Sequence, residues 1–344
     1  MMGKTPTQAK HVPSTSSTSA THSQAERMQL LVCIEDDQRS AGAISHVQTI
    51  AQALGGDVVL LHFLEAAEKG GAPLDPVDWE IRRRVANDVL TNLAQKYQTA
   101  DHAIQVAVLE GRRIDQLCGY AARHPGGITA FGRIEGAEGL HAWRAARCLV
   151  DADIGSILMV PSAAFTTAPT RYACVFVALD GSSVSESVIP SAAAIAKQQN
   201  AKLIVCHVVP DPGSINIGLQ DRELQDLQMR LVKRAKTAAR TYLDRINDML
   251  KGYGTPATTT MIVEGDARKS LLKTIRERGG DLLIMASHGQ GMDPTLPSGH
   301  VASFILDHAD IPVLMMRPQR NSGDAHVSAE PVHKGTRQPA DTET

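Results

Sequence analysis

Short apolar runs alternate with longer amphipathic segments along most of this chain. The runs in its second half predict strands near residues 173–179, 202–209, 258–263, 281–286 and 312–316. These runs are continuous rather than polar at every second position, which is typical of parallel strands that are buried on both faces. Their alternation with helical segments indicates repeated βαβ units and a parallel sheet.

One helical segment is unusually long. Its apolar side chains recur at helical spacing, at Leu224, Leu227, Leu231, Ala235, Ala238, Tyr242 and Ile246. A stripe with this period predicts an amphipathic helix that packs one face on the sheet.

The pattern occurs twice, which predicts a duplication. The run that ends at Asp36 aligns with the run that ends at Asp180 at an offset of 144 residues, and His62 aligns with His207 at an offset of 145. Further on, residues 108–111 align with 262–265 at an offset of 154, and residues 157–160 align with 313–316 at an offset of 156. Four landmarks in the same order are not expected by chance.

Polar segments rich in Ser, Thr, Pro and Gly flank and separate the two repeats. The predicted division is a disordered tail over residues 1–26, a first domain over 27–161, a linker over 162–170, a second domain over 171–318 and a disordered tail over 319–344. Each domain then has the size of one compact α/β unit. Because the linker is short, the two domains are expected to touch.

Composition narrows the classes of function. The 344 residues carry a net charge of -2 and only 3% aromatic residues, so neither a basic face nor stacking platforms for nucleic acid are expected. No apolar run approaches the roughly 18 residues that cross a membrane, so no membrane partner is expected. The five cysteines lie far apart, without CxxC spacing, mostly in apolar runs. They are predicted to be buried reduced thiols, which favours a cytoplasmic protein.

The residues that follow the strands are the candidates for chemistry, because ligands of an open parallel sheet bind beyond the carboxyl ends of its strands. Asp180 stands there, and its carboxylate is suited either to accept hydrogen bonds from ribose or to cap the next helix. The second candidate is the glycine-bearing loop over residues 286–301. Its backbone N–H groups and the helix that follows are suited to hold phosphate, and the alternative is an ordinary surface turn.

The motifs of this second half resemble the universal stress protein family. Nucleotide-binding members of that family have G-x2-G-x9-G-[ST] at this place, and this chain has Ala286, Gly289, Gly299 and His300 at the same spacing. Further segments typical of the family are Glu-Gly-Asp-Ala at 264–267, Ser-His-Gly at 287–289 and His-Ala-Asp-Ile-Pro-Val-Leu at 308–314. The resemblance covers residues 171–318, and the duplication makes the whole chain resemble a tandem universal stress protein.

The resemblance implies an α/β fold with two doubly wound, Rossmann-like sheets of the adenine nucleotide alpha hydrolase-like type. Each sheet is expected to have five parallel strands in the order 3-2-1-4-5, with helices on both faces and right-handed crossovers. In proteins of this kind the last strand is an edge that pairs with a second copy. Here the strands at 157–160 and 312–316 are expected to pair within one chain as an internal pseudo-dimer, and a homodimer is a further candidate.

The resemblance also implies an adenine nucleotide, ATP or a relative, as the ligand of the second domain. The assigned residues are Asp180 for ribose, Val208 for adenine, Met285 and Ala286 for base and sugar, and Gly289, Gly299, His300 and Val301 for the phosphates.

Several residues argue against a triphosphate. Residues 290–298 contain no Lys or Arg, and Asp293 adds a negative charge where phosphates are expected. Ala286 adds a methyl group, and His300 places a ring where the family has a small hydroxyl residue. Asp293 is a candidate ligand for Mg²⁺, although one carboxylate is little for such a site.

The first repeat departs further from the family pattern. It keeps an aspartate, Asp36, but side chains stand at both glycine positions of the loop, with Glu135 at the first and Trp143 or Ala145 at the second. A phosphate site is not expected there. This half is interpreted as a partner surface or a regulator.

The predicted function is therefore a cytoplasmic stress-response module, a nucleotide sensor or a scaffold, without turnover. One alternative is a protein-interaction module that binds no nucleotide. Another is an enzyme that uses an adenine nucleotide, with His288, Asp293 and His300 in one loop, but no HExxH, GxSxG or Walker-type motif supports catalysis. His62 and His207 are interpreted as structural residues at the end of the sheet.

Overall fold

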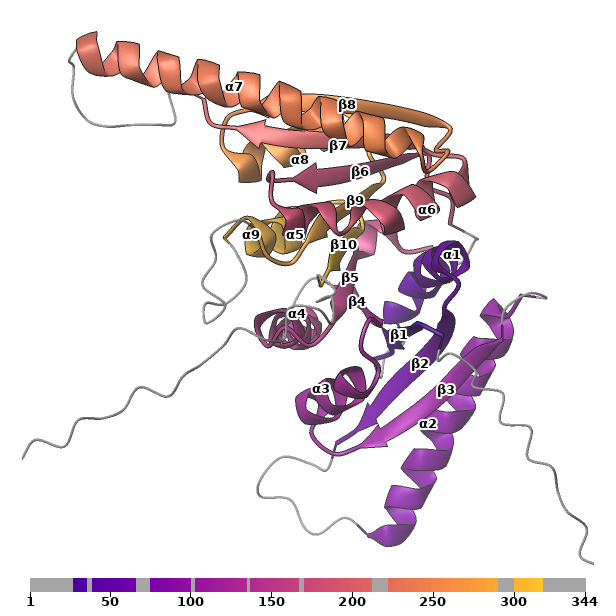
Figure 1. The fold of residues 1–344 in the computed structure, drawn as a ribbon. Helices are drawn as coiled ribbons and strands as arrows, with labels where there is room; N and C mark the ends of the chain where they lie inside the picture. The colour runs from indigo at the N-terminus through magenta and orange to yellow at the C-terminus, as the bar shows by residue number, and fades with distance from the viewer. Residues whose placement is uncertain are drawn as a thin grey trace, which may run out of the picture.

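A computed structural model shows how the two repeats are arranged (Figure 1). The structure describes residues 27–35, 39–65, 75–99, 103–134, 137–166, 170–211, 222–289 and 300–317, without the side chains of 39–40, 137–141 and 222–228. The two predicted tails lie outside these residues.

The described strands form one ten-stranded sheet, in the order β3-β2-β1-β4-β5-β10-β9-β6-β7-β8. The first half contributes β1 (Gln29–Cys33), β2 (Asp57–Leu64), β3 (Ile104–Glu110), β4 (Ile128–Arg133) and β5 (Ser156–Pro161). The second half contributes β6 (Cys174–Leu179), β7 (Lys202–Val209), β8 (Ala257–Glu264), β9 (Leu282–Ala286) and β10 (Val313–Met316). Within each half the paired strands are parallel and follow the order 3-2-1-4-5, which confirms the prediction.

The two halves join at the centre of the sheet. There β5 and β10 pair antiparallel, with Leu158 opposite Leu314. Each strand thereby covers the exposed edge of the other half, so the predicted pairing within one chain is confirmed.

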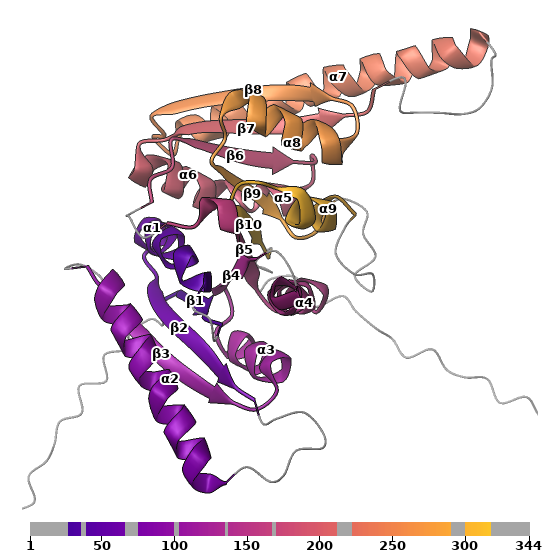
Figure 2. The ribbon, with the colours of Figure 1, turned by 180° about the vertical axis from the view of Figure 1, so that it is seen from behind.

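Helices cover both faces of the sheet (Figures 1 and 2). One face carries α1 (Ile44–Leu54), α2 (Pro76–Tyr97), α5 (Ser183–Glu186), α6 (Ile189–Gln199) and α7 (Arg222–Lys251), around one buried cluster. The other face carries α3 (Arg113–Arg123), α4 (Ala137–Asp151), α8 (Ala267–Arg278) and α9 (His300–His308), around a second cluster. Short 3-10 turns, η1 (Arg39–Ala43) and η2 (Ser162–Ala164), complete the described elements. None of the described helices combines the length and the apolarity needed to cross a membrane.

The long helix α7 is present as predicted, but it buries a different face. Leu231 and Ala238, predicted to pack on the sheet, are exposed, whereas Val232, Ala239 and Leu243 are buried. The N-terminal part of α7 projects beyond the sheet (Figure 1), and Met229 and Leu231 are 56% and 50% exposed there. Of the other predicted positions, Ala235 and Tyr242 are half-buried, Ile246 is buried, and the side chains of Leu224 and Leu227 lie outside the described residues.

The predicted linker is bonded to α1, so the two halves touch. His46 Nε2 lies 2.8 Å from the carbonyl of Ala164, and the hydroxyl of Thr49 donates to the carbonyl of Thr170 at 2.8 Å. The hydroxyl of Tyr172 lies 2.9 Å from Nδ1 of His46. Because a carbonyl only accepts, Nε2 carries a hydrogen, and in the neutral imidazole Nδ1 then accepts from the phenol. Burial lowers the pKa of His46, in agreement with this assignment.

Candidate functional site

Asp180 directly follows β6, and the start of α5 holds its carboxylate. Oδ1 accepts hydrogen bonds from the backbone N–H of Ser182 at 2.9 Å and from its hydroxyl at 2.6 Å. Gly181 has a φ of +91°, a conformation that favours glycine. The cap of α5 is Ser182, whose hydroxyl oxygen accepts from the N–H of Ser185 at 3.0 Å. The N-cap of α5 is therefore Ser182 and not Asp180, so the capping alternative for Asp180 is wrong. The Asp180 carboxylate accepts its hydrogen bonds from Ser182.

The glycine loop meets this carboxylate. A Cβ atom at Gly289 would lie 2.3 Å from Oδ2 of Asp180, well inside contact distance. The two residues approach because β6 and β9 are neighbours in the sheet, with Val177 opposite Ile284. The structure thus brings together two predicted site residues that are far apart in the sequence, at a distance that only glycine allows.

The apolar residues predicted for the base and sugar divide between the two faces of the sheet. Val208 and Met285 pack in the cluster beneath α8 and α9, as does Val301 at the start of α9. Ala286 packs in the cluster on the opposite face, because successive side chains of a strand point to opposite faces. Met285 and Ala286 therefore face opposite sides of the sheet, and their assignment to the base and sugar stays a prediction.

The phosphate end of the predicted site is described in part. His300 begins α9 with an exposed side chain, and Val301 is half-buried. Gly299 and residues 290–298, including the Mg²⁺ candidate Asp293, lie outside the described residues. His288 lies before them, with Nδ1 at 2.9 Å from the hydroxyl oxygen of the buried Ser287.

Helix α7 adds residues to this region that the sequence did not predict for it. The ring of Tyr242 lies 5.5 Å from that of His207, measured between centroids. Burial raises the pKa of Tyr242 to about 12, and the negative charges of Glu186 and Asp180 contribute. Arg245 pairs with Glu186 through both terminal nitrogens of its guanidinium. Periodicity indicated only core packing for Tyr242, because it does not show what lies beneath a helix.

The hydrogen bonds of two histidines show which residue of the first half is equivalent to Asp180. Nδ1 of His62 lies 3.0 Å from the carbonyl of Ile34, and Nδ1 of His207 lies 2.9 Å from the carbonyl of Leu179. Ile34 and Leu179 are therefore equivalent, at an offset of 145 residues. Glu35, the next residue, is the counterpart of the aspartate that follows β6.

The alignment of Asp36 with Asp180 at an offset of 144 is thus wrong by one residue, and Asp36 itself lies outside the described residues. The helices repeat the corrected offset, since α1 starts at Ile44 and α6 at Ile189. The hydrogen bonds of the two histidines to neighbouring strands agree with their interpretation as structural residues.

Glu35 pairs with an arginine in the first turn of α3. Nη1 of Arg113 contacts Oε2 of Glu35, and the two side chains are only 19% and 20% exposed. Burial alone lowers the pKa of Arg113, but the Glu35 carboxylate outweighs this effect and raises it. The backbone N–H of Arg113 also donates to Glu65 at 2.6 Å. The carboxylate at the end of β1 is therefore neutralised by a residue of the same half.

The second half has no arginine at the equivalent position. Gly111 and Gly265 have the same φ of +122° after β3 and β8, and they identify equivalent turns. Two residues later stand Arg113 in the first half and Ala267 in the second.

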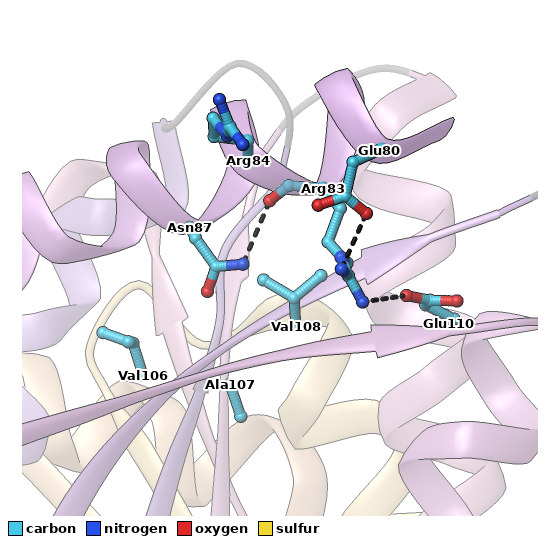
Figure 3. A pocket seen from close by; sticks show the side chains of 8 residues that line it. All are labelled: Glu80, Arg83, Arg84, Asn87, Val106, Ala107, Val108 and Glu110. Carbon is cyan, nitrogen blue, oxygen red and sulfur yellow. Dashed lines mark hydrogen bonds and ion pairs between the residues drawn. The ribbon is translucent and has the colours of Figure 1, made fainter. Parts of the chain in front are cut away.

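Two pockets lined by described residues lie away from this site. One, of about 430 Å³, lies between α2 and the edge strand β3 (Figure 3). Among its charged residues, Arg83 contacts Glu80 at 2.6 Å and Glu110 at 3.8 Å. The other, of about 510 Å³, lies between the two halves beside Ser156 and Arg317. Neither includes a residue predicted for the nucleotide.

The cysteines fall into two groups. Cys33, Cys174 and Cys206 are buried, as predicted. Cys118 and Cys148 are half-buried and lie together, with their sulfur atoms 3.6 Å apart, which corrects the expectation of five separated, buried thiols. Spacing along the sequence gave no sign of this pair, because 30 residues separate them and they lie on different helices.

Comparison with known families matches residues 172–317 to the Universal stress protein family. Universal stress protein A of Yersinia pestis is 26% identical over 153 residues, which are 44% of this chain and 98% of the relative. Universal stress protein A of Escherichia coli (strain K12) is 26% identical over 117 residues, which are 34% of this chain and 76% of the relative.

Solved structures extend the likeness to both halves. A universal stress protein from Archaeoglobus fulgidus matches 84% of this chain and 96% of its own, with a TM-score of 0.57 and 16% identity. A functionally unknown protein from Pseudomonas aeruginosa matches 85% of this chain and 93% of its own, with a TM-score of 0.55 and 17% identity. At such identities the likeness shows the fold alone.

Proposed function

We propose, because residues 172–317 match the Universal stress protein family, that the second half of the chain binds an adenine nucleotide and signals its presence without turnover. The observation that carries the proposal is the approach of Gly289 to Oδ2 of Asp180, at a distance that admits no side chain. One oxygen of the Asp180 carboxylate is fixed by Ser182 and the other lies beside the backbone of Gly289, at the carboxyl end of β6, where ligands of an open parallel sheet bind.

We assign the contacts of the base and the phosphates to residues of β7, β9 and α9. Val208 and Met285, on one side of the sheet, are assigned to adenine, and the start of α9 at His300 is assigned to phosphate. Because residues 290–298 contain no Lys or Arg, AMP and ADP are expected to bind at least as tightly as Mg-ATP. A magnesium ion would enter with the nucleotide and need no further protein ligand.

The first half has a different role in this proposal. Its equivalent carboxylate is already neutralised by Arg113, so a nucleotide has no corresponding acceptor to bind. We assign this half to contacts with a protein partner or to regulation of the second half. The domain limits at 27–161 and 171–318, the cytoplasmic location and a homodimer remain predictions.

The test is calorimetric titration of the purified full chain with Mg-ATP, ADP and AMP. The wild type is expected to bind with a Kd on the order of micromolar, and Gly289→Glu is expected to abolish binding because its side chain meets the Asp180 carboxylate. The matched control is Gly119→Glu, since a Cβ there meets only Nη1 of Arg123 at 3.7 Å. The control adds the same charge and should bind as the wild type does.

The alternatives make different predictions. If no nucleotide gives heat, and denatured protein releases none, the proposal fails and a protein-interaction module without nucleotide replaces it. If ATP is consumed and product accumulates, and replacement of His300 stops it, the chain is an enzyme and the absence of turnover is wrong.

A further inference from the structure

The pair Cys118 and Cys148 has no role in the nucleotide site. Cys118 lies on α3 and Cys148 on α4, and their sulfur atoms are 3.6 Å apart. A disulfide has a sulfur–sulfur distance of about 2.05 Å, so the atoms must approach by roughly 1.5 Å, which side-chain rotation and a small helix shift can supply.

Exposure separates this pair from the other thiols. Cys118 and Cys148 are half-buried, whereas Cys33, Cys174 and Cys206 are buried in the clusters on the two faces of the sheet. A small oxidant therefore reaches the pair more readily than the others.

We propose that Cys118 and Cys148 form a reversible disulfide when the protein meets a peroxide. The thiolate of Cys148 attacks one peroxide oxygen, the O–O bond breaks, and the sulfur becomes a sulfenic acid with release of hydroxide. The sulfur of Cys118 then attacks the sulfenic sulfur, the S–O bond breaks, and the thiol proton leaves with that oxygen as water. In total two thiols are oxidised, and one peroxide is reduced to two waters.

The order of attack follows from the surroundings of Cys118. Burial raises the pKa of this thiol to about 12, with further contributions from its hydrogen bond with Cys148 and from the charge of Asp115. Cys118 therefore stays protonated at neutral pH and is assigned the second step. The oxidation is expected to be slow for the same reason.

The bond would link two neighbouring helices of the first half. α4 also reaches the second half, because the indole N–H of Trp143 donates to a carboxylate oxygen of Asp307 on α9. A link between α3 and α4 thus restrains the helix that contacts α9, whose first residue is His300. It is expected to raise the Tm by about 5 °C.

The experiment treats the native full chain with hydrogen peroxide and maps its tryptic peptides without reduction. Peptides that contain Cys118 and Cys148 are expected to appear joined, with a mass lower by two hydrogens, and dithiothreitol should restore them. Cys148→Ser and Cys118→Ser should abolish the joined peptide. The matched control, Cys206→Ser, should keep it.

Three results would overturn the inference. One is that both thiols stay open to alkylation after peroxide treatment. Another is that they become separate sulfinic acids. The last is that the joined peptides come only from two different chains, as seen on a non-reducing gel. Each can be measured on the wild type, so the inference remains testable even if a serine variant does not fold.

Discussion

The carboxyl ends of β1 and β6 are equivalent places in the two halves, yet they hold opposite arrangements. At the first, Glu35 pairs with Arg113, and at the second, Asp180 faces the backbone of Gly289. The Glu35 side chain is only 20% exposed, so its charge needs a cation or hydrogen-bond donors to be stable, whereas Asp180 is exposed. The first half supplies the cation itself, whereas the second uses serine donors for one oxygen and leaves room for glycine beside the other. A duplicated fold can thus retain its backbone while its two copies satisfy equivalent carboxylates in different ways.

The largest expected effect comes from transferring the arginine of the first half into the second. Ala267→Arg places a guanidinium at the position equivalent to Arg113, where it can pair with Asp180. Nucleotide affinity should fall about 100-fold, or roughly 3 kcal/mol, because the carboxylate would be neutralised internally. Calorimetric titration measures the change, and Ala267→Met controls for added bulk. Equal affinity in the arginine variant and the wild type would mean that the difference at this position does not decide ligand binding.

Removing the cation from the first half should affect stability instead. Arg113→Met leaves the charge of Glu35 largely buried and is expected to lower the free energy of unfolding by about 2 kcal/mol. Urea denaturation measures this loss. The double variant Glu35→Gln with Arg113→Met should recover part of it, because no unpaired charge remains.

A suitable control for that experiment is the neighbouring arginine. Arg112 is 89% exposed in its ion pair with Asp115, so Arg112→Met should change stability by less than about 0.5 kcal/mol. If both arginine variants are equally stable, the ion pair at the end of β1 contributes no more to stability than an exposed ion pair does.

A smaller effect concerns pH and is confined to the linker side of the first half. The folded state lowers the pKa of His46 below its ordinary 6.5, chiefly by burial. The unfolded chain therefore takes up a proton at a higher pH than the folded chain does, and stability falls as the pH drops below about 6.5. The Tm should decrease by a few degrees between pH 7.5 and 5.5. His46→Gln should reduce this dependence, whereas the exposed His308→Gln should leave it unchanged, and the reverse pattern would contradict the assignment.

The smallest expected effect is on stability, and it comes from the same substitution, glycine to alanine, made once in each half. Gly119→Ala fills open space on a helix and should stabilise the chain by about 0.5–1 kcal/mol. Gly289→Ala instead meets the Asp180 carboxylate and should weaken nucleotide binding without such a gain. Thermal unfolding and titration measure the two properties, and identical behaviour of both variants would remove the argument for a close approach at Gly289.

Much of the fold could be predicted because burial determines composition directly. Strands that are covered on both faces must be apolar throughout, so β6 to β10 appeared as runs whose ends agree with the structure within one residue. The same property explains why the alignment of the two halves was wrong by one residue. A continuous apolar run looks alike when it is shifted by one residue, so the alignment matched Asp36 to Asp180. The hydrogen bond of His62 to Ile34 and the starts of α1 and α6 identified Glu35 instead.

By itself, the sequence determined the strands and the duplication, because these depend on local apolar patterns and on chain order, whereas the pairing of β5 with β10 was expected from the family resemblance. Only the tertiary structure decided which face of α7 is buried, which carboxylate meets which cation, and which thiols are neighbours. Glu35 and Arg113 are 78 residues apart, and Cys118 and Cys148 are 30 apart. Their meeting depends on which strand ends and helix faces the sheet brings together, and a periodic pattern carries no information about that.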